Sequence, residues 1–239
     1  MQSVKNIVLV HGAWADGSSW SKIIPLLQAK GFQVACTQNP LTSVEDDVAT
    51  ANRIINAQDG PVLVVGHSYG GAIITEAGNN PKVAGLVYVA AFAPDEGETL
   101  GGLAQPYGAT PLFSELKTIA DGFLLLTEKG MSEDFAQDLS ADEKSTMFAT
   151  QGATQSKILG TPIGKAAWHS KPSWFVVAAN DRAISPEQQK VTAKRMGAKI
   201  LTVPTSHVAM LAEPQKVAAF ILEAAATVGE KAPSGVAAA

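Results

Sequence analysis

The residues of this chain that could do chemistry begin with a serine set between two glycines. Gly66-His67-Ser68-Tyr69-Gly70 follows the apolar run of residues 61–65, and a helix-forming stretch begins directly after it. This arrangement is typical of a nucleophile elbow, in which a strand turns sharply into a helix and presents a serine hydroxyl at the corner. So tight a turn leaves no room for a side chain at Gly66 or Gly70. The pattern therefore predicts that Ser68 is a nucleophile.

A base must remove the proton of such a serine, because a neutral hydroxyl is a poor nucleophile. Of the four histidines, His207 lies in a polar loop directly after the last predicted strand. In a parallel sheet, loops of this kind meet at the carboxyl edge, where the elbow also lies. We therefore predict that His207 is the base. His67 is expected to serve the geometry of the turn, His11 to head a glycine-containing loop, and His169 to be exposed or to serve packing.

The base needs an acidic group that fixes its tautomer, and two aspartates follow predicted strands at the same edge. Asp181 lies between the serine and the histidine in chain order, at the end of the strand predicted over residues 173–179. Asp95 follows the strand predicted over residues 83–92 and is the alternative. A purely structural role for Asp181, as a turn residue paired with Arg182, is also open. On chain order we predict that Asp181 is the acid.

A tetrahedral adduct on the serine also needs backbone N–H donors for its oxygen. One should be the N–H of Tyr69, directly after the nucleophile, and we predict that the other is the N–H of Ala13. Ala13 lies in the loop after the first strand, where Gly12 loosens the backbone. Its neighbours Gly12 and Trp14 are expected to contact the substrate, although Gly12 could also be an ordinary turn residue.

The segments around these residues alternate between strands and helices. Strands are predicted over residues 6–10, 32–37, 61–65, 83–92, 173–179 and 199–203. Helices are predicted over residues 20–30, 43–57, 72–77, 185–197 and 213–228. Strands so uniformly apolar must be covered on both faces, which is typical of a parallel sheet between two layers of helices. The chain is therefore predicted to be an α/β protein with a mostly parallel, doubly wound sheet.

The alternation is interrupted between residues 94 and 171, which are richer in Gly, Thr, Gln and charged residues. Here the sequence indicates only short helices, one of them opened by a capping box at Ser140 to Glu143. We expect residues 94–171 to form a lid inserted after the sixth strand, and residues 1–93 and 172–230 to form the core. Residues 231–239 are small and unpatterned, and are expected to be disordered.

The composition is that of one soluble α/β domain. The 239 residues are 46% hydrophobic and carry a net charge of −4, so we expect no nucleic-acid partner, which would need a basic face. No apolar run approaches the length of a membrane span and no apolar leader precedes the first strand, so a cytoplasmic protein without a membrane partner is expected. The single cysteine, Cys36, excludes an internal disulfide and is expected to be a buried thiol. The sequence shows neither a metal-ligand cluster nor a dinucleotide glycine loop, so no metal and no cofactor is expected.

Six segments together resemble the α/β-hydrolase superfamily. They are Val8–Ala13, Gly66–Gly71, Ala90–Asp95, Asp181–Ile184, His207–Leu211 and Glu213–Lys216. Within that superfamily the chain most resembles the branch of plant methylesterases and hydroxynitrile lyases and its bacterial esterase-like relatives. The resemblance implies a Ser-His-Asp triad and places the acid in the segment that begins at Asp181. It covers the core from the first strand to about Asp95, and again from about Pro172 to the last helix.

Two features depart from this family. An acidic residue often precedes the family's catalytic histidine, where this chain has Ser206. The insertion does not visibly match the sequences of the family. Because this segment shapes the acyl pocket, the resemblance implies the catalytic roles of the residues but not the identity of the substrate. The insertion holds several apolar residues, which favour small, fairly apolar acyl groups over long lipid chains: Phe113, Phe123, Leu125, Phe135 and Trp168.

The leading hypothesis is therefore a cofactor-free serine hydrolase that cleaves a small carboxylic ester or lactone through an acyl-enzyme on Ser68. The alternatives are a lyase or perhydrolase with the same triad, or a ligand-binding protein without catalysis. In the lyases that the chain resembles, a threonine stands at the position of Gly12 and a lysine at that of Val208. Glycine and valine at these two positions, which are expected to contact the substrate, favour hydrolysis. The sequence leaves the oligomeric state open, a homodimer included.

Overall fold

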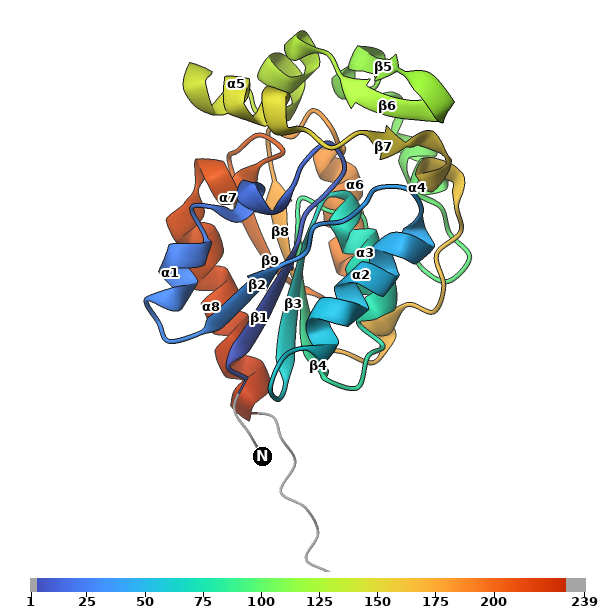
Figure 1. The fold of residues 1–239 in the computed structure, drawn as a ribbon. Coiled ribbons are helices and arrows are strands. Elements are labelled where there is room, and N and C mark those ends of the chain that lie inside the picture. Colours follow the sequence, from blue (N-terminus) through green and yellow to red (C-terminus); the bar gives the residue numbers. More distant parts are fainter. Residues whose placement is uncertain (1–3, 231–239) are drawn as a thin grey trace, which may run out of the picture.

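A parallel sheet of six strands runs through the computed structural model, which describes residues 4–230 (Figure 1). In spatial order its strands are β2 (Gln33–Cys36), β1 (Asn6–Val10), β3 (Val62–His67), β4 (Val83–Val89), β8 (Ser173–Ala178) and β9 (Lys199–Val203). Each neighbouring pair is parallel. Every strand predicted from the sequence is present, so the predicted α/β class with a mostly parallel sheet is confirmed.

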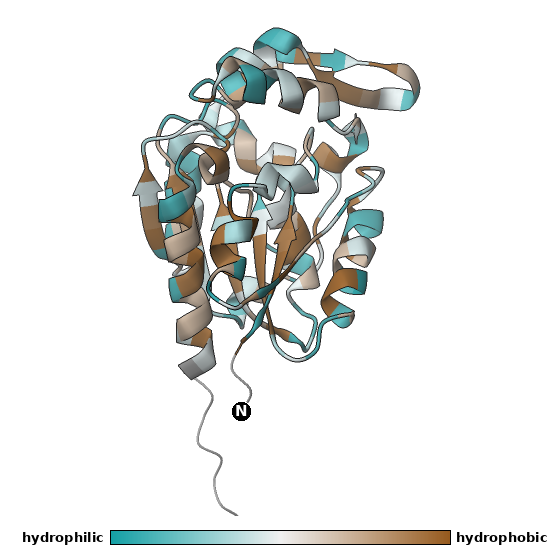
Figure 2. Ribbon diagram, turned by 60° about the vertical axis from the view of Figure 1, so that its left-hand side comes forward, coloured by the Kyte–Doolittle hydropathy of each residue, from teal (hydrophilic) through white to brown (hydrophobic). Residues whose placement is uncertain are grey.

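Helices cover both faces of this sheet. α1 (Ile24–Gln28) and α8 (Pro214–Glu230) lie on one face, and α2 (Val44–Asn56) and α3 (Tyr69–Ala77) lie on the other (Figure 1). α6 (Pro186–Arg195) packs against β8, and the short α7 (Ala209–Ala212) leads into α8. The brown, apolar colour of Figure 2 concentrates on the central strands and on the helix faces turned toward them. Helices thus cover both faces of the sheet, as strands that are apolar on both faces require.

The burial of the strands follows their position in the sheet. Every residue of β1 and β3 is buried, whereas most residues of the edge strands β2 and β9 are half-buried or exposed. Cys36 lies on the edge strand β2 and is half-buried, so the expectation of a fully buried thiol was wrong. Partial burial still raises the pKa of this thiol to about 11, which keeps it protonated at neutral pH.

Two of the differences between the predicted and the observed bounds have local reasons. β4 stops at Val89 rather than at residue 92, because Ala90 has a positive φ of 44° and interrupts the extended chain. The helix predicted over residues 20–30 is reduced to α1 and a preceding 3₁₀ turn at Gly17–Trp20. Pro25 explains the break, since it has no N–H with which to extend a helix from the residues before it.

Residues 94–171 leave the main sheet after β4 and return before β8. They contain a second, antiparallel sheet, three helical elements and several short 3₁₀ turns: β5 (Leu116–Thr118), β6 (Phe123–Leu126), β7 (Thr154–Gln155), α4 (Leu100–Ala104), α5 (Ala141–Thr150) and a π-helix at Gly130–Phe135. The capping box predicted at Ser140 and Glu143 opens α5. The expectation that this insertion holds only helices was wrong, because strands this short owe their pairing to neighbours that are distant in sequence.

The place of the insertion in the strand order also needs correction. It was expected after the sixth strand, but it follows β4, the fourth strand of the chain. The four apolar segments that precede residue 94 are all used in the main sheet, so no further strand can come before the insertion. Figure 1 shows the insertion above the carboxyl edge of that sheet. Its two ends are joined by hydrogen bonds from Gly97 to Ile163 and from Ile163 to Glu98.

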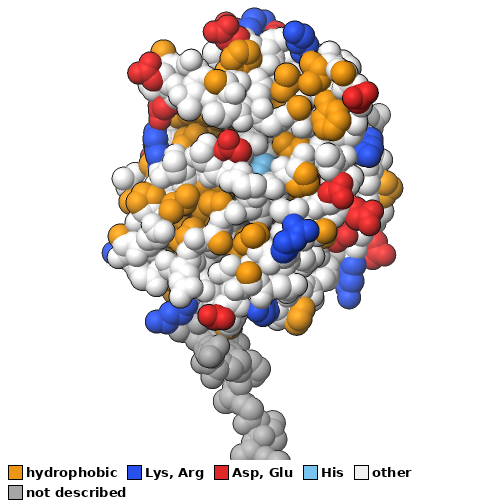
Figure 3. All heavy atoms as spheres, in the orientation of Figure 1, with side chains coloured by type: hydrophobic (Ala, Val, Ile, Leu, Met, Phe, Trp, Pro, Cys, Tyr) orange, Lys and Arg blue, Asp and Glu red, His pale blue; other side chains and the backbone are white. Residues whose placement is uncertain are grey.

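The surface carries charges of both signs. On the face shown in Figure 3, Lys and Arg side chains are scattered among Asp and Glu side chains, over both the core and the insertion.

Among residues 4–230, no helix is both long enough and apolar enough to cross a bilayer. The tail that was predicted to be disordered, residues 231–239, lies outside the described part of the chain.

Candidate active site

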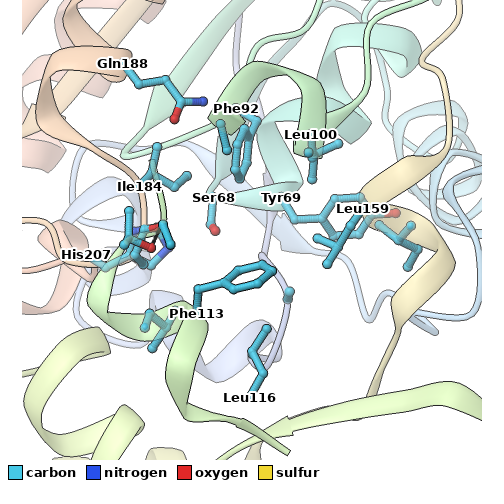
Figure 4. Close-up of a pocket in the computed structure, with 18 of the residues that line it drawn as sticks. Ser68, Tyr69, Phe92, Leu100, Phe113, Leu116, Leu159, Ile184, Gln188 and His207 are labelled. Atoms are coloured by element: carbon cyan, nitrogen blue, oxygen red, sulfur yellow. Dashed lines mark hydrogen bonds between the residues drawn. The ribbon is translucent and has the colours of Figure 1, made fainter. Parts of the chain in front are cut away.

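Ser68 lies at the carboxyl end of β3, in the turn that leads into α3. Its backbone has φ 54° and ψ −123°, a conformation that residues with a side chain rarely adopt. The flanking glycines are required by close packing. A Cβ on Gly66 would lie 2.5 Å from the carbonyl oxygen of Gly70, and one on Gly70 would lie 2.5 Å from that of Val10. The pattern thus folds into a sharp elbow, with Ser68 at the wall of a cavity (Figure 4).

His207 and Asp181 meet at the same edge of the sheet, although they lie in loops after different strands. The Nδ1–H of His207 donates a hydrogen bond of 2.7 Å to Oδ2 of Asp181, and both side chains are buried. Because a carboxylate can only accept, this contact sets the tautomer of His207 and leaves Nε2 for a second partner. The alternative acid, Asp95, instead contacts the exposed His169 at 2.8 Å. The structure therefore pairs His207 with Asp181.

The carboxylate of Asp181 has further donors that sequence reasoning missed. Its Oδ1 accepts from the backbone N–H groups of Ala183 and Ile184, at 2.7 and 2.9 Å. Its Oδ2 also accepts from Nε2 of Gln189, at 2.7 Å. Gln189 is fully buried on α6. In the sequence it could be noticed only as an uncharged polar residue on the helix that follows Asp181. These donors hold the carboxylate in the orientation that His207 requires.

Ser68 and His207 line the same cavity, and Figure 4 shows both residues at its wall. Within residues 4–230, the structure describes no hydrogen bond between their side chains. Hydrogen bonds between a nucleophile and its base are often long in structures without substrate, and tighten once substrate is bound. The arrangement therefore places the ring of His207 and the hydroxyl of Ser68 at one cavity.

Two backbone N–H groups beside Ser68 are available to an anionic oxygen. Tyr69 is the first residue of α3, so its N–H has no acceptor within the helix. In the loop after β1, the N–H of Trp14 already donates to Oγ1 of Thr154 at 3.2 Å. Ala13 lines the cavity, and among the described residues its N–H has no acceptor. The fold thus leaves unpaired the two N–H groups that the sequence analysis selected.

A buried carboxyl group that the sequence analysis missed lies against Tyr69. Asp47 of α2 is completely buried, and its Oδ2 accepts from the hydroxyl of Tyr69 at 2.7 Å while its Oδ1 accepts from the N–H of Leu41 at 2.9 Å. Burial raises the pKa of Asp47 to about 6, and burial followed by the charge of Asp47 raises the pKa of Tyr69 well above its usual range. The only signal in the sequence was an aspartate on the apolar face of an amphipathic helix.

A second histidine, His67, packs directly behind His207. The two ring centroids are 4.6 Å apart, and the Nε2–H of His67 donates to the backbone carbonyl of His207 at 3.0 Å. Burial, and then the neighbouring His207, lower the pKa of His67 well below its ordinary value. His67 therefore stays neutral and supports the loop of His207 without adding a positive charge beside it. The sequence had indicated only a role in the turn.

The two other histidines hold loops in place. His11 donates from Nδ1 to the carbonyl of Gly12 at 2.8 Å and accepts at Nε2 from the N–H of Asn39 at 2.8 Å. Burial lowers the pKa of His11, which keeps it neutral in this role. His169 stacks on Trp168 near the surface, with ring centroids 3.8 Å apart. Among residues 4–230, no three His, Cys, Asp or Glu side chains are grouped so as to hold a metal ion.

The cavity beside Ser68 lies between the core and the insertion and has a volume of about 390 Å³ (Figure 4). Its lining is largely apolar and includes Phe92, Leu100, Phe113, Leu116, Leu159 and Ile184. None of the lining residues is Asp, Glu, Lys or Arg. An uncharged, apolar group can therefore occupy this space without losing the hydration of a charge.

The predicted substrate contacts divide into two groups. Trp14 lines the cavity, whereas Gly12 and Val208 are not among its lining residues, which differs from the prediction. A Cβ on Gly12 would lie 2.7 Å from the Cβ of Ser68, so this glycine lets the loop after β1 approach the elbow. Val208, which follows His207 in the chain, is fully buried. Of the apolar residues noted in the insertion, Phe113 lines the cavity and the others do not: Phe123, Leu125, Phe135 and Trp168.

The family model described as "Alpha/beta hydrolase family" matches residues 7–220, so the chain belongs to the α/β-hydrolase family. The chain is 27% identical to salicylic acid-binding protein 2 of Nicotiana tabacum, over 94% of this chain and 98% of the relative. It is 23% identical to methylesterase 2 of Arabidopsis thaliana, over 91% and 95%. The crystal structure of a pyrethroid hydrolase from Sphingobium faniae matches with a TM-score of 0.81 at 22% identity, over 94% of this chain and 98% of that one.

These findings confirm the resemblance to plant methylesterases and bacterial esterase-like proteins that the sequence motifs indicated. The α/β-hydrolase fold is confirmed as well, with its mostly parallel sheet and its helices on both faces. The chain is an esterase-type enzyme of this family, and ester hydrolysis is the class of reaction that its relatives support.

The buried Asp47 leads to a prediction about stability. Its pKa is raised from 3.8 to about 6, so the folded protein binds this proton more tightly than the unfolded chain does. The stabilisation is fully present below pH about 4 and is lost as the pH rises through about 6. Between pH 5 and pH 7, the free energy of unfolding of the wild type should fall by about 1 kcal/mol relative to that of Asp47→Asn.

Urea unfolding of both proteins at the two pH values measures this difference. The matched control is Asp46→Asn, because Asp46 is an exposed neighbour whose pKa is lowered by hydrogen bonds from Thr42 and Ser43. It stays ionised at both pH values, and its charge is the smallest of the contributions to the pKa of Asp47, so its replacement should change the pH dependence far less than Asp47→Asn does. Equal pH dependence in the wild type and in Asp47→Asn would contradict the prediction.

Proposed function

We propose that this α/β-hydrolase cleaves small, uncharged carboxylic esters or lactones through an acyl-enzyme on Ser68. The observation that carries the proposal is the buried 2.7 Å hydrogen bond between His207 and Asp181, next to the elbow serine in one apolar cavity. A base oriented by a buried acid beside a serine is the arrangement that activates a hydroxyl for nucleophilic attack. Relatives named as a methylesterase and a pyrethroid hydrolase support ester hydrolysis as the reaction.

In the first half of the reaction, Nε2 of His207 takes the proton of Ser68 as Oγ attacks the carbonyl carbon of the ester. The N–H groups of Ala13 and Tyr69 stabilise the oxygen of the tetrahedral adduct. Asp181 holds the Nδ1–H of the imidazolium that forms and stabilises its charge. The imidazolium then gives its proton to the leaving alcohol, the C–O bond breaks, and the acyl group stays on Oγ.

Water completes the second half of the reaction. His207 removes a proton from the water as its oxygen attacks the acyl carbon, and the same two N–H groups stabilise the adduct. Collapse of the adduct breaks the bond to Ser68, and His207 returns the proton to Oγ. These steps need only the named residues and water, so we propose a cofactor-free reaction.

The lining of the cavity supports an uncharged substrate. A carboxylate or ammonium group in a space without charged side chains would lose its hydration without a partner, which costs several kcal/mol. A volume of about 390 Å³ suits a compact acyl or alcohol group better than the long chains of a triglyceride. Gln188 also lines the cavity, and its amide, in a side chain that is 3% exposed, has no hydrogen-bond partner among the described residues. A carbonyl or hydroxyl group of the substrate can fill this role.

Two positions favour ester hydrolysis over cleavage of a cyanohydrin. At Gly12 a Cβ would lie 2.7 Å from the Cβ of Ser68, so a side chain carrying a hydroxyl cannot be accommodated there without a shift. Val208 is fully buried and brings no charge that could stabilise a departing cyanide. The two groups that the resembling lyases use are therefore both missing from this chain.

Replacing Ser68 by alanine should abolish turnover and leave the fold intact, because the hydroxyl borders the cavity and contributes little to the core. We expect the rate to fall by about 10⁴- to 10⁶-fold. An alkyl fluorophosphonate probe should label the wild type at Ser68, as mapped by mass spectrometry of the digested protein, and should not label Ser68→Ala. Labelling that persists in the variant would assign the nucleophile to another residue.

Asp181→Asn should lower kcat by about 10⁴-fold, because an amide favours the wrong tautomer of His207. Asp95→Asn is the matched control, since its carboxylate contacts His169 at the surface, and it should keep most of the activity. Hydrolysis of p-nitrophenyl acetate by the two variants compares them directly. If Asp95→Asn is the inactive one, the acid has been assigned to the wrong strand.

A matched pair of esters tests the substrate class. Methyl heptanoate should be hydrolysed with a kcat/KM at least about 100-fold above that of monomethyl adipate, which has similar length and a terminal carboxylate without a partner in the cavity. Mandelonitrile should be cleaved more slowly than the neutral ester. A preference for the charged ester, or faster cleavage of the cyanohydrin, would contradict the proposed substrate class.

A further inference from the structure

Four residues of the insertion lie against the two loops that carry Asp181 and His207. They end or follow the π-helix at Gly130–Phe135, and we name them the clasp: Asp134, Phe135, Gln137 and Asp138. None of them lines the cavity beside Ser68. Their contacts with the core therefore need an explanation other than binding of the substrate.

On the acid loop, the clasp holds both neighbours of Asp181. Nε2 of Gln137 donates to the backbone carbonyl of Asn180 at 2.8 Å. Arg182, which the sequence offered as a partner of Asp181, instead forms an ion pair with Asp134, with Nε and Oδ1 2.9 Å apart. The carboxylate of Asp134 is almost fully buried in this contact. The insertion thus contacts the residues on both sides of Asp181, through the backbone of Asn180 and through the side chain of Arg182.

On the base loop, the clasp contacts His207 and the residue before it. The backbone N–H of Ser206 donates to Oδ2 of Asp138 at 2.6 Å. The ring of Phe135 is fully buried and lies edge-on against His207, with centroids 4.8 Å apart. Ser206 brings no carboxylate of its own to this turn, and Asp138 supplies one from a segment 68 residues away.

We propose that the clasp positions the acid–base pair, and that Asp138 is its positioning residue on the loop of His207. This inference rests on the proposed function of Asp181 and His207. The two loops follow different strands, β8 and β9, and meet in one 2.7 Å hydrogen bond. Such a site tolerates a displacement of only about 0.5 Å. The clasp contacts atoms directly beside that bond on both loops, and so limits their movement relative to each other.

The role has a consequence for the insertion as a whole. A movement that lifts the clasp from the core would also separate Asp181 from His207. The conformation in which the insertion covers the cavity is therefore also the one in which Asp181 and His207 are aligned. Loss of a clasp contact should then lower kcat and leave KM nearly unchanged, because the clasp does not touch the cavity.

The test compares three variants of the full chain in hydrolysis of p-nitrophenyl acetate. Asp138→Ala removes the acceptor for Ser206, Asp138→Asn keeps an oxygen at the same place, and Asp142→Ala removes a neighbouring exposed carboxylate without such a contact. We expect kcat of Asp138→Ala to fall about tenfold with KM within about twofold of the wild type. Asp138→Asn should restore kcat to within about threefold, and Asp142→Ala should match the wild type. The low-field proton resonance of the His207 Nδ1–H should broaden or shift in Asp138→Ala alone.

Several results would overturn the proposal. They are an unchanged kcat in Asp138→Ala, a change confined to KM, or a loss that Asp138→Asn does not restore. If Asp138→Ala fails to fold, Gln137→Ala decides, because it removes the separate contact to Asn180 and should also lower kcat at unchanged KM. Fluorophosphonate labelling of the wild type at Ser68 separates the two ideas. Without labelling the proposed function itself fails, whereas normal labelling with a fully active Asp138→Ala refutes only the clasp.

Discussion

The backbone of Ser68 is held at φ 54° and ψ −123°, and the rest of the site is arranged around this strained residue. Such a conformation costs on the order of 1–3 kcal/mol and persists only where the surroundings over-determine it. Here the N–H of Ser68 donates to the carbonyl of Val89 at 3.2 Å, and its carbonyl accepts from the N–H of Phe92 at 3.1 Å. The end of β4 therefore braces the elbow. The elbow brings the hydroxyl to the wall of the cavity, next to the N–H of Tyr69, which has no helical partner because Tyr69 is the first residue of α3.

Fixed hydrogen-bond donors surround the carboxylate of Asp181. The carboxylate of Asp181 accepts four hydrogen bonds, from His207, Gln189 and two backbone N–H groups. His67, which packs against His207, and His11, in the loop after β1, stay neutral because burial lowers their pKa values. The cavity adds no charged side chain. In such surroundings of low polarity, fixed hydrogen-bond donors act strongly on the charges that develop during ester cleavage.

The insertion contributes to this site through two separate sets of residues. Apolar side chains such as Leu100 and Phe113 line the cavity, where they determine which groups fit beside Ser68. The clasp lies outside the cavity, against the loops of the acid and the base. Because the two sets do not overlap, replacements in the lining can change the range of substrates while the acid–base pair keeps its support.

The sequence by itself determined the α/β class and the elbow, because glycine spacing and apolar strands are local features. The residues at the strand ends also led from the sequence to the proposed roles of Ser68, His207 and Asp181. It misjudged the small antiparallel sheet of the insertion and the strand order around it. It also missed Asp47, Gln189 and the clasp. Gln189 lies 8 positions from Asp181, but on a separate element. The other hydrogen bonds join residues far apart in the chain, 22 positions for Asp47 and Tyr69 and 68 for Asp138 and Ser206. Only the tertiary structure decides such partners, since no local pattern specifies which buried polar groups will meet when separate elements pack together.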